Sequence, residues 1–259
     1  MTTFSHSGTT GDVLSSLCLV KILGGGDYYL RLNNLDSICR SIGWGNAGRH
    51  SGRMTQRDFD ALEPLMRIQP QVTSFQVYNG EQIDYEFEQT AHHMNPPGWP
   101  RSFTRQYAAA LAVDPEQHHR ELDIESFLIA DRAYRVPGRP IMIARNRWYL
   151  DGIADPSAVP QWQNWIECGL ADQSFYCGLE EEHQWSESLM KVKIPWVKTE
   201  DCLELARYQW GCELIIANQS MPGTMAINLG KTCWIETRKN TPLENNEIYY
   251  PYKINVNYF

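Results

Sequence analysis

Short apolar runs alternate with helical patterns through the second half of the chain. The runs predicted as strands cover 141–144, 174–177, 193–197, 213–217 and 232–236, and the predicted helices between them cover 161–169, 180–190, 200–210 and 222–229. Strands separated by helices of this length are typical of βαβ units, in which a parallel sheet carries helices on both faces. The pattern therefore predicts an α/β fold with a parallel sheet.

The first half of the chain begins with the same alternation. Its predicted strands are 3–6, 27–32 and 72–78, and its predicted helices are 12–23 and 55–69. The second helix has Thr55 as a candidate N-cap, and its apolar positions share one face. That buried stripe is expected to consist of Phe59, Leu62, Leu65 and Met66.

The pattern weakens between positions 80 and 138, where prolines gather and no clear period is visible. The segment Pro137–Pro140 is the expected lobe boundary, because Pro and Gly interrupt regular structure. We therefore expect a first lobe at 1–137 and a second lobe at 138–259, with the tail from 240 to 259 packed back on the body.

The composition of the chain excludes several classes of protein. The 259 residues are 42% hydrophobic and 21% charged, which excludes a disordered or fibrous chain. A net charge of −8 argues against a surface that binds polyanions everywhere. The seven cysteines include no C-x-x-C pair, which favours a reduced, cytoplasmic setting, and Lys21 interrupts the N-terminal apolar stretch too early for a signal peptide or a membrane span.

The turn Ser5–Asp12 is the first candidate site. It is rich in Gly, Ser and Thr and joins a predicted strand to a predicted helix, where the helix N-terminus favours negative charge. It lacks the Gly-Lys-Ser/Thr of a phosphate-binding Walker loop. The alternative is an ordinary capped turn in which Asp12 only stabilises the helix dipole.

The run from 132 to 147 holds five arginines and no acid in 16 residues. Arg145 and Arg147 follow a predicted strand directly, so their guanidinium groups are candidates to bind a diphosphate. The alternative is a solvated basic edge that pairs with acidic residues elsewhere.

Two loops of the second lobe carry further candidates. Asn218 and Gln219 follow a predicted strand and suit sugar hydroxyls or phosphate oxygens, with Ser220 as the next helix cap. Glu182 and His183 lie in the acidic start of another helix. The alternatives are an ordinary capped loop and a solvated face. Neither the His pairs nor the Asp-x-Asp at 58–60 has the spacing of a metal site, so no metal is expected.

Four segments together resemble the heptosyltransferase-like glycosyltransferases of family 9. These segments are TTGDVLSSLCLV, ARNRWY, FYCGLEEEHQW and LIIANQSMPGTMAINLG, in the expected order across both lobes. The resemblance implies a GT-B architecture, with two Rossmann-like lobes whose parallel sheets face a central cleft. It also implies that Asp12 is the general base, that Gly11 lies beside the acceptor, and that the second lobe binds the nucleotide sugar. The residues implied for that donor site are Arg145, Arg147, Glu182, His183, Asn218, Gln219 and Ser220.

The implied reaction is metal-independent, inverting transfer of a sugar from a nucleotide-diphosphate sugar to an acceptor hydroxyl, with no further cofactor. The sugar is not carried over, because this chain has Asn218–Gly223 where heptosyltransferases have an Asp-x-Gly-x-x-His motif.

A saccharide is the favoured acceptor, and the oligomeric state is left open. The stretch 40–57 supports an alternative acceptor, because it holds four arginines, four glycines and Trp44 but no acid. Trp44, Arg49 and Arg53 would suit DNA, as in a phage-type enzyme that glycosylates hydroxymethylated pyrimidines. A third possibility is a non-catalytic nucleotide-sugar-binding protein.

Overall fold

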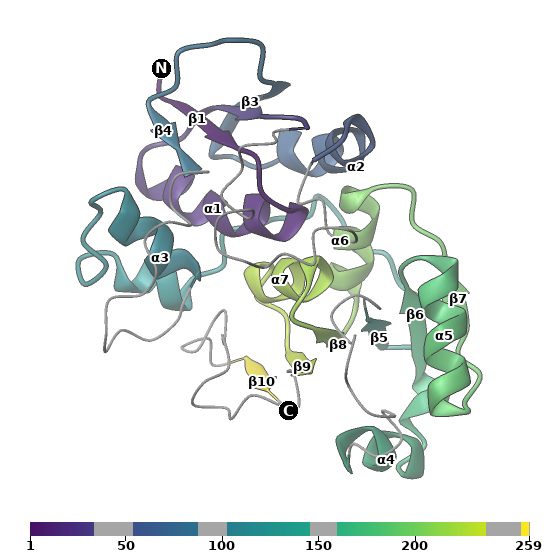
Figure 1. Cartoon of the computed structure of the whole chain (residues 1–259). Helices are drawn as coiled ribbons and strands as arrows, with labels where there is room; N and C mark the ends of the chain where they lie inside the picture. Colours follow the sequence, from purple (N-terminus) through teal and green to yellow (C-terminus); the bar gives the residue numbers. More distant parts are fainter. Residues whose placement is uncertain (34–53, 88–102, 146–159, 237–254, 259) are drawn as a thin grey trace. The chain divides into compact units, whose positions relative to one another are not determined.

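The computed structural model describes residues 1–33, 54–87, 103–145, 160–236 and 255–258 (Figure 1). The chain divides into two compact units between Ile129 and Ala130. Each unit is an α/β layer structure, and every pairing between named strands in the described ranges is parallel. The α/β class is therefore confirmed, while the boundary at 137–138 stays a prediction.

Unit 1 contains a four-stranded sheet in the order β3-β2-β1-β4. Its core includes Phe4, Leu14, Leu17, Tyr28 and Leu62, all inaccessible to solvent. The strands are β1 (Thr3–His6), β2 (Gly26–Leu30), β3 (Val72–Val77) and β4 (Tyr85–Glu86), and the helices are α1 (Thr10–Ile22), α2 (Gln56–Arg67), α3 (Phe103–Ala110) and the π-helical segment η3 (Arg120–Ile124).

The local signals for α2 are confirmed. Thr55 is the N-cap, and its side chain accepts a hydrogen bond from the Asp58 amide. The predicted apolar stripe of α2 is buried throughout. The helix α1 begins at Thr10 rather than at Asp12, because Thr9 is its N-cap and the helix therefore starts two residues earlier. The helix α3 lies in the stretch where no clear period was visible.

Unit 2 contains a six-stranded sheet in the order β10-β9-β8-β5-β6-β7. With β5 counted as the first strand, this is the Rossmann order 3-2-1-4-5-6, whose topological switch point lies between β5 and β8. The strands are β5 (Ile141–Ala144), β6 (Ser174–Cys177), β7 (Trp196–Val197), β8 (Leu214–Asn218), β9 (Cys233–Glu236) and β10 (Val256–Tyr258), and the helices are α4 (Pro160–Glu167), η6 (Leu170–Gln173), α5 (Glu180–Met190), α6 (Cys202–Gly211) and α7 (Met221–Asn228).

The helices of unit 2 cover both faces of this sheet. Crossovers between parallel strands are right-handed, so α4 and α5 lie on one face and α6 and α7 on the other. Figure 1 shows α5 alongside β6 and β7, and α6 contacts α7. All four residues of β5 and of β6 are buried, as expected for strands covered on both faces. No helix in the described ranges is long and apolar enough to cross a membrane.

Gly223 sets the close approach of α7 to β8. A Cβ atom at this position would collide with the Asn218 carbonyl oxygen and would lie 3.4 Å from Ile235 Cδ1. The first turn of α7 therefore lies against the end of β8 only because residue 223 has no side chain.

We expect Gly223→Ala to destabilise unit 2 by about 1–3 kcal/mol, because the added methyl must displace backbone atoms of β8. Chemical denaturation followed by circular dichroism measures the change. The control Glu213→Ala alters an exposed side chain just before β8 and should change stability by less than about 0.5 kcal/mol. Equal stability of Gly223→Ala and wild type would contradict the packing described here.

Candidate functional site

The carboxyl edge of the unit 1 sheet carries the first candidate site. By the carboxyl edge we mean the side of a sheet where its parallel strands end, which is where α/β proteins bind ligands. The strand β1 ends at His6, between β2 and β4, and the turn after it leads into α1. Asp12 lies in the first turn of that helix.

Asp12 is held by its own helix cap. Its Oδ2 atom accepts hydrogen bonds from the Thr9 amide at 2.7 Å and from the Thr9 hydroxyl at 2.8 Å. No donor among the described residues contacts the other oxygen, Oδ1. Burial raises the pKa of Asp12, and the two bonds from Thr9 oppose that rise. The carboxylate is therefore oriented by one oxygen and is more basic than an exposed aspartate.

His6 lies beside Asp12 as a neutral ring. The Gly8 amide donates to His6 Nδ1 at 2.8 Å, so in the neutral ring Nε2 carries the proton and donates to the Tyr107 hydroxyl at 3.0 Å. Burial lowers the pKa of His6 to about 3. This histidine is therefore uncharged near neutral pH and is a poor proton acceptor.

Gly8 keeps these two side chains close. A Cβ atom at Gly8 would lie 2.6 Å from His6 Cε1 and 2.8 Å from Asp12 Oδ2. The glycine-rich turn is thus required by side chains packed on both sides of it.

The carboxyl edge of unit 2 is built around a buried ion pair. Arg145 follows β5 directly, and Glu236 is the last residue of β9. Arg145 Nε donates to Glu236 Oε2 at 2.8 Å, and Nη2 donates to Oε1 at 2.9 Å. The guanidinium also lies over the rings of Trp162 and Trp185, 5.0 and 5.4 Å from their centroids. The sequence predicted an arginine that projects from the strand end, whereas the structure shows one that is already paired.

The Asn218 loop lies at the end of the neighbouring strand β8. The Asn218 side-chain oxygen accepts a hydrogen bond from the Ser220 hydroxyl at 2.6 Å, and the Asn218 carbonyl accepts one from the Ser220 amide at 2.7 Å. Ser220 is the N-cap of α7, as predicted. Asn218 and Gln219 are both buried, so this loop is compact and internally bonded.

The two candidates on α5 differ in placement. Glu182 is buried in the first turn, where its carboxylate accepts a bond from the Leu179 amide at 3.4 Å. His183 contacts the Ile194 carbonyl at 2.7 Å and Glu187 at 3.4 Å, which ties α5 to the segment before β7. His183 therefore has a structural role in unit 2, and its predicted donor contact stays a prediction.

Four predicted site residues, Arg147, Trp44, Arg49 and Arg53, lie outside the described residues. Gly11 lies in the first turn of α1 beside Asp12. Within the part of the chain that the structure describes, no three His, Cys, Asp or Glu side chains cluster in a way that would hold a metal ion.

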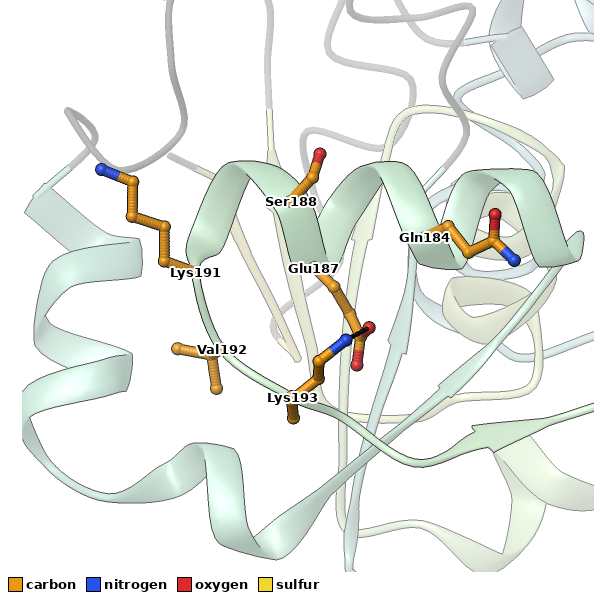
Figure 2. A pocket seen from close by; sticks show the side chains of 6 residues that line it. All are labelled: Gln184, Glu187, Ser188, Lys191, Val192 and Lys193. Carbon is orange, nitrogen blue, oxygen red and sulfur yellow. Dashed lines mark hydrogen bonds and ion pairs between the residues drawn. The ribbon is translucent and has the colours of Figure 1, made fainter.

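Figure 2 shows a pocket at the far end of α5, lined by Gln184, Glu187, Ser188, Lys191, Val192 and Lys193. Because α5 returns from the carboxyl edge toward the start of β7, this pocket is on the opposite side of the sheet from the Arg145 pair. The Glu187 carboxylate already accepts hydrogen bonds from Lys193 Nζ at 2.9 Å and from the Ile194 amide at 2.7 Å. We therefore place no reaction there.

Several solved structures with a similar fold are named as glycosyl transferases or heptosyltransferases. A family 9 glycosyl transferase from Veillonella parvula aligns with a TM-score of 0.57 and 9% identity, over 99% of this chain and 85% of that one. ADP-heptose LPS heptosyltransferase II from E. coli aligns with a TM-score of 0.52 and 12% identity, over 100% and 90% of the two chains. The chain has the GT-B fold of the heptosyltransferases.

The E. coli heptosyltransferase WaaC with ADP shares this GT-B fold, with a TM-score of 0.52 and 11% identity over 99% of this chain and 92% of that one. No protein-family model and no curated protein matches the chain. The likeness to the GT-B structures is therefore one of fold.

Sequence reasoning missed the roles of three residues at these edges. Glu236 lay in a predicted strand and His6 in the candidate turn Ser5–Asp12, each without a role of its own, and Tyr107 lay outside every predicted element. One sequence feature could have pointed to two of them: Glu236 and His6 are each a charged or titratable residue at the last position of a strand. No local signal connects Tyr107 to His6, because 101 positions separate them.

The pKa of His6 gives a prediction for stability against pH. Folding lowers this pKa from 6.5 to about 3, so the unfolded chain binds the proton more readily. The stabilising contribution of neutral His6 is fully present above about pH 6.5 and is lost as the pH falls toward 3. Between pH 7 and pH 5, the free energy of unfolding should fall by about 2 kcal/mol more in wild type than in His6→Gln.

Urea denaturation at the two pH values measures this difference. Exposed His119→Gln is the control and should lose as much stability on acidification as wild type. The same loss in His6→Gln as in wild type would show that His6 does not titrate in this way.

Proposed function

We propose that this protein is a glycosyltransferase that moves a sugar from a nucleotide-diphosphate sugar to an acceptor hydroxyl. The observation that carries the proposal is Asp12, a basic carboxylate oriented through one oxygen at the carboxyl edge of unit 1. The GT-B fold supports the reaction class, and two structures with this fold have ADP or ADP-heptose in their names.

Asp12 acts as the general base in this proposal. Its Oδ1 atom takes the proton from the acceptor hydroxyl while that oxygen attacks the anomeric carbon of the donor. The bond from the anomeric carbon to the diphosphate breaks, and the nucleoside diphosphate leaves with the bonding electron pair. A single displacement of this kind inverts the anomeric configuration.

The leaving diphosphate is bound at the carboxyl edge of unit 2. Negative charge grows on it as the bond breaks, and preorganised N–H donors stabilise that charge. Arg145 and the N-terminus of α7 are the described donors at the ends of β5 and β8. We propose that these groups take the place of a metal ion by donating N–H hydrogen bonds to the leaving group.

A saccharide is the proposed acceptor. The alternatives, a hydroxymethylated pyrimidine in DNA and a non-catalytic role in nucleotide-sugar binding, have no described residue that favours them over this proposal.

Asp12→Asn should lower the rate of sugar transfer by about 10²–10⁴-fold, because the amide cannot accept the proton. A radiolabelled-donor assay with saccharide acceptors measures transfer, and binding of the nucleoside diphosphate should stay unchanged. The matched control is Asp58→Asn in α2, where Thr55 bonds Asp58 Oδ2 through its amide at 2.8 Å and its hydroxyl at 2.6 Å. This control makes the same change in the equivalent helix cap of α2 and should retain full activity. Retained turnover in Asp12→Asn would exclude Asp12 as the base.

One nucleoside diphosphate, or its sugar, should raise the melting temperature of the protein by about 5 °C at a hundredfold excess over Kd. A thermal-shift screen of the adenine, uracil, guanine, cytosine and thymine nucleotides, each with and without EDTA, identifies the donor class. The same rise with EDTA is expected for a site that uses no metal. A rise that EDTA abolishes would contradict metal independence, and donor binding without hydrolysis or transfer would favour the non-catalytic alternative.

A further inference from the structure

The ion pair at the carboxyl edge of unit 2 is buried on both sides. The side chain of Arg145 is 0% exposed and that of Glu236 is 3% exposed. Glu236 occupies Nε and Nη2 of the guanidinium, whereas Nη1 is buried with no hydrogen-bond partner in the described structure. An unpaired N–H on a buried cation is costly, so an acceptor beyond the described residues is expected to complete it.

The place of this donor in the fold points to a ligand. Arg145 follows β5, the strand at the switch point of the Rossmann order, and Glu236 ends β9 one strand beyond β8. Ligands of such sheets bind outside the carboxyl ends of the strands at this point. The unpaired N–H and the expected ligand position are therefore independent observations that coincide.

The charge of the pair limits what Arg145 offers to that ligand. Glu236 neutralises the guanidinium, so an oxygen that approaches Nη1 meets one hydrogen-bond donor and no net positive charge. An arginine with all of its N–H groups available would hold a diphosphate by two parallel charged bonds. A product held that firmly leaves slowly, and product release limits the turnover of many enzymes.

We propose that Glu236 sets the affinity of this site for the leaving nucleoside diphosphate by competing with it for Arg145. The inference rests on the proposed function, because it assumes that the diphosphate binds at this edge. Glu236 is a positioning residue in this scheme: it directs Nη1 toward one phosphate oxygen and weakens the hold on the product.

The test is Glu236→Gln, which keeps the shape of the side chain and removes its charge. Arg145 then becomes a buried cation without a counter-ion, so the ligand-free protein should melt at a lower temperature. The diphosphate becomes the remaining counter-ion, so the nucleoside diphosphate that stabilises wild type should bind about tenfold more tightly. Its stabilising shift should be larger, and it should inhibit transfer about tenfold more strongly as a product, with a lower kcat.

The matched control is Asp123→Asn in unit 1. Arg105 Nη2 donates to Asp123 Oδ2 at 2.6 Å, in a pair whose side chains are 11% and 4% exposed. The variant loses a comparable buried charge pair away from unit 2. It should melt at a lower temperature without any change in nucleotide affinity or product inhibition.

A double variant covers the case in which Glu236→Gln does not fold. Arg145→Met with Glu236→Leu replaces the whole pair by apolar side chains. Proteins often tolerate such a replacement of a buried ion pair. It should fold but bind the nucleoside diphosphate about tenfold more weakly than wild type, because the Nη1 donor is gone. Wild-type affinity in this variant would overturn the inference.

The outcomes separate the two proposals. Unchanged nucleotide affinity in Glu236→Gln, with clear binding by wild type, overturns the inference and leaves the proposed function standing. No response of wild type to any of the five nucleoside diphosphates overturns the proposed function and the inference together.

Discussion

Parallel pairing of the strands is the constraint on which the rest of this structure depends. Parallel neighbours cannot be joined by a tight turn, so each connection crosses a face of the sheet and returns the chain to the same starting edge. The polar residues that end the strands, among them His6, Asn218 and Glu236, are therefore gathered at the carboxyl edges. The candidate chemistry of both units lies just past the end of a buried strand, in a turn, a cap and the first turn of a helix.

The same threonine–aspartate cap occurs at the start of α1 and of α2, but the two copies have different roles. Thr9 with Asp12 and Thr55 with Asp58 form two helix starts in which the carboxylate accepts hydrogen bonds from the threonine amide and hydroxyl at similar distances. Only the first comes after the strand β1, which lies between β2 and β4, and only the first is packed against a buried histidine across a glycine. Asp12 is a candidate base because of where its helix begins in the sheet, since its hydrogen bonds to Thr9 are those of an ordinary helix start.

Much of the fold could be predicted from the sequence, because a strand that is buried on both faces of its sheet consists of a short run of apolar residues. The strands at 3–6, 141–144 and 174–177 were predicted with the bounds that the structure has. The helix α3 was not predicted, because it lies between 80 and 138, where prolines gather and no clear period is visible. For the candidate site, the turn that carries Asp12 was located from the sequence pattern and the role of Asp12 as a base came from the family resemblance, whereas the pairing of Arg145 with Glu236 had no local signal. Contacts between residues so far apart depend on strand order, which periodicity does not encode.

The separation of Arg145 and Glu236 along the chain also has a kinetic meaning. The pair joins residues 91 positions apart and requires β8 and β9 to be in place beside β5. Contacts of such long range are costly in chain entropy to close, so they form late in folding. An interaction absent from the transition state slows unfolding while leaving the folding rate almost unchanged. Because unfolding must break this pair, we expect it to lengthen the lifetime of folded unit 2.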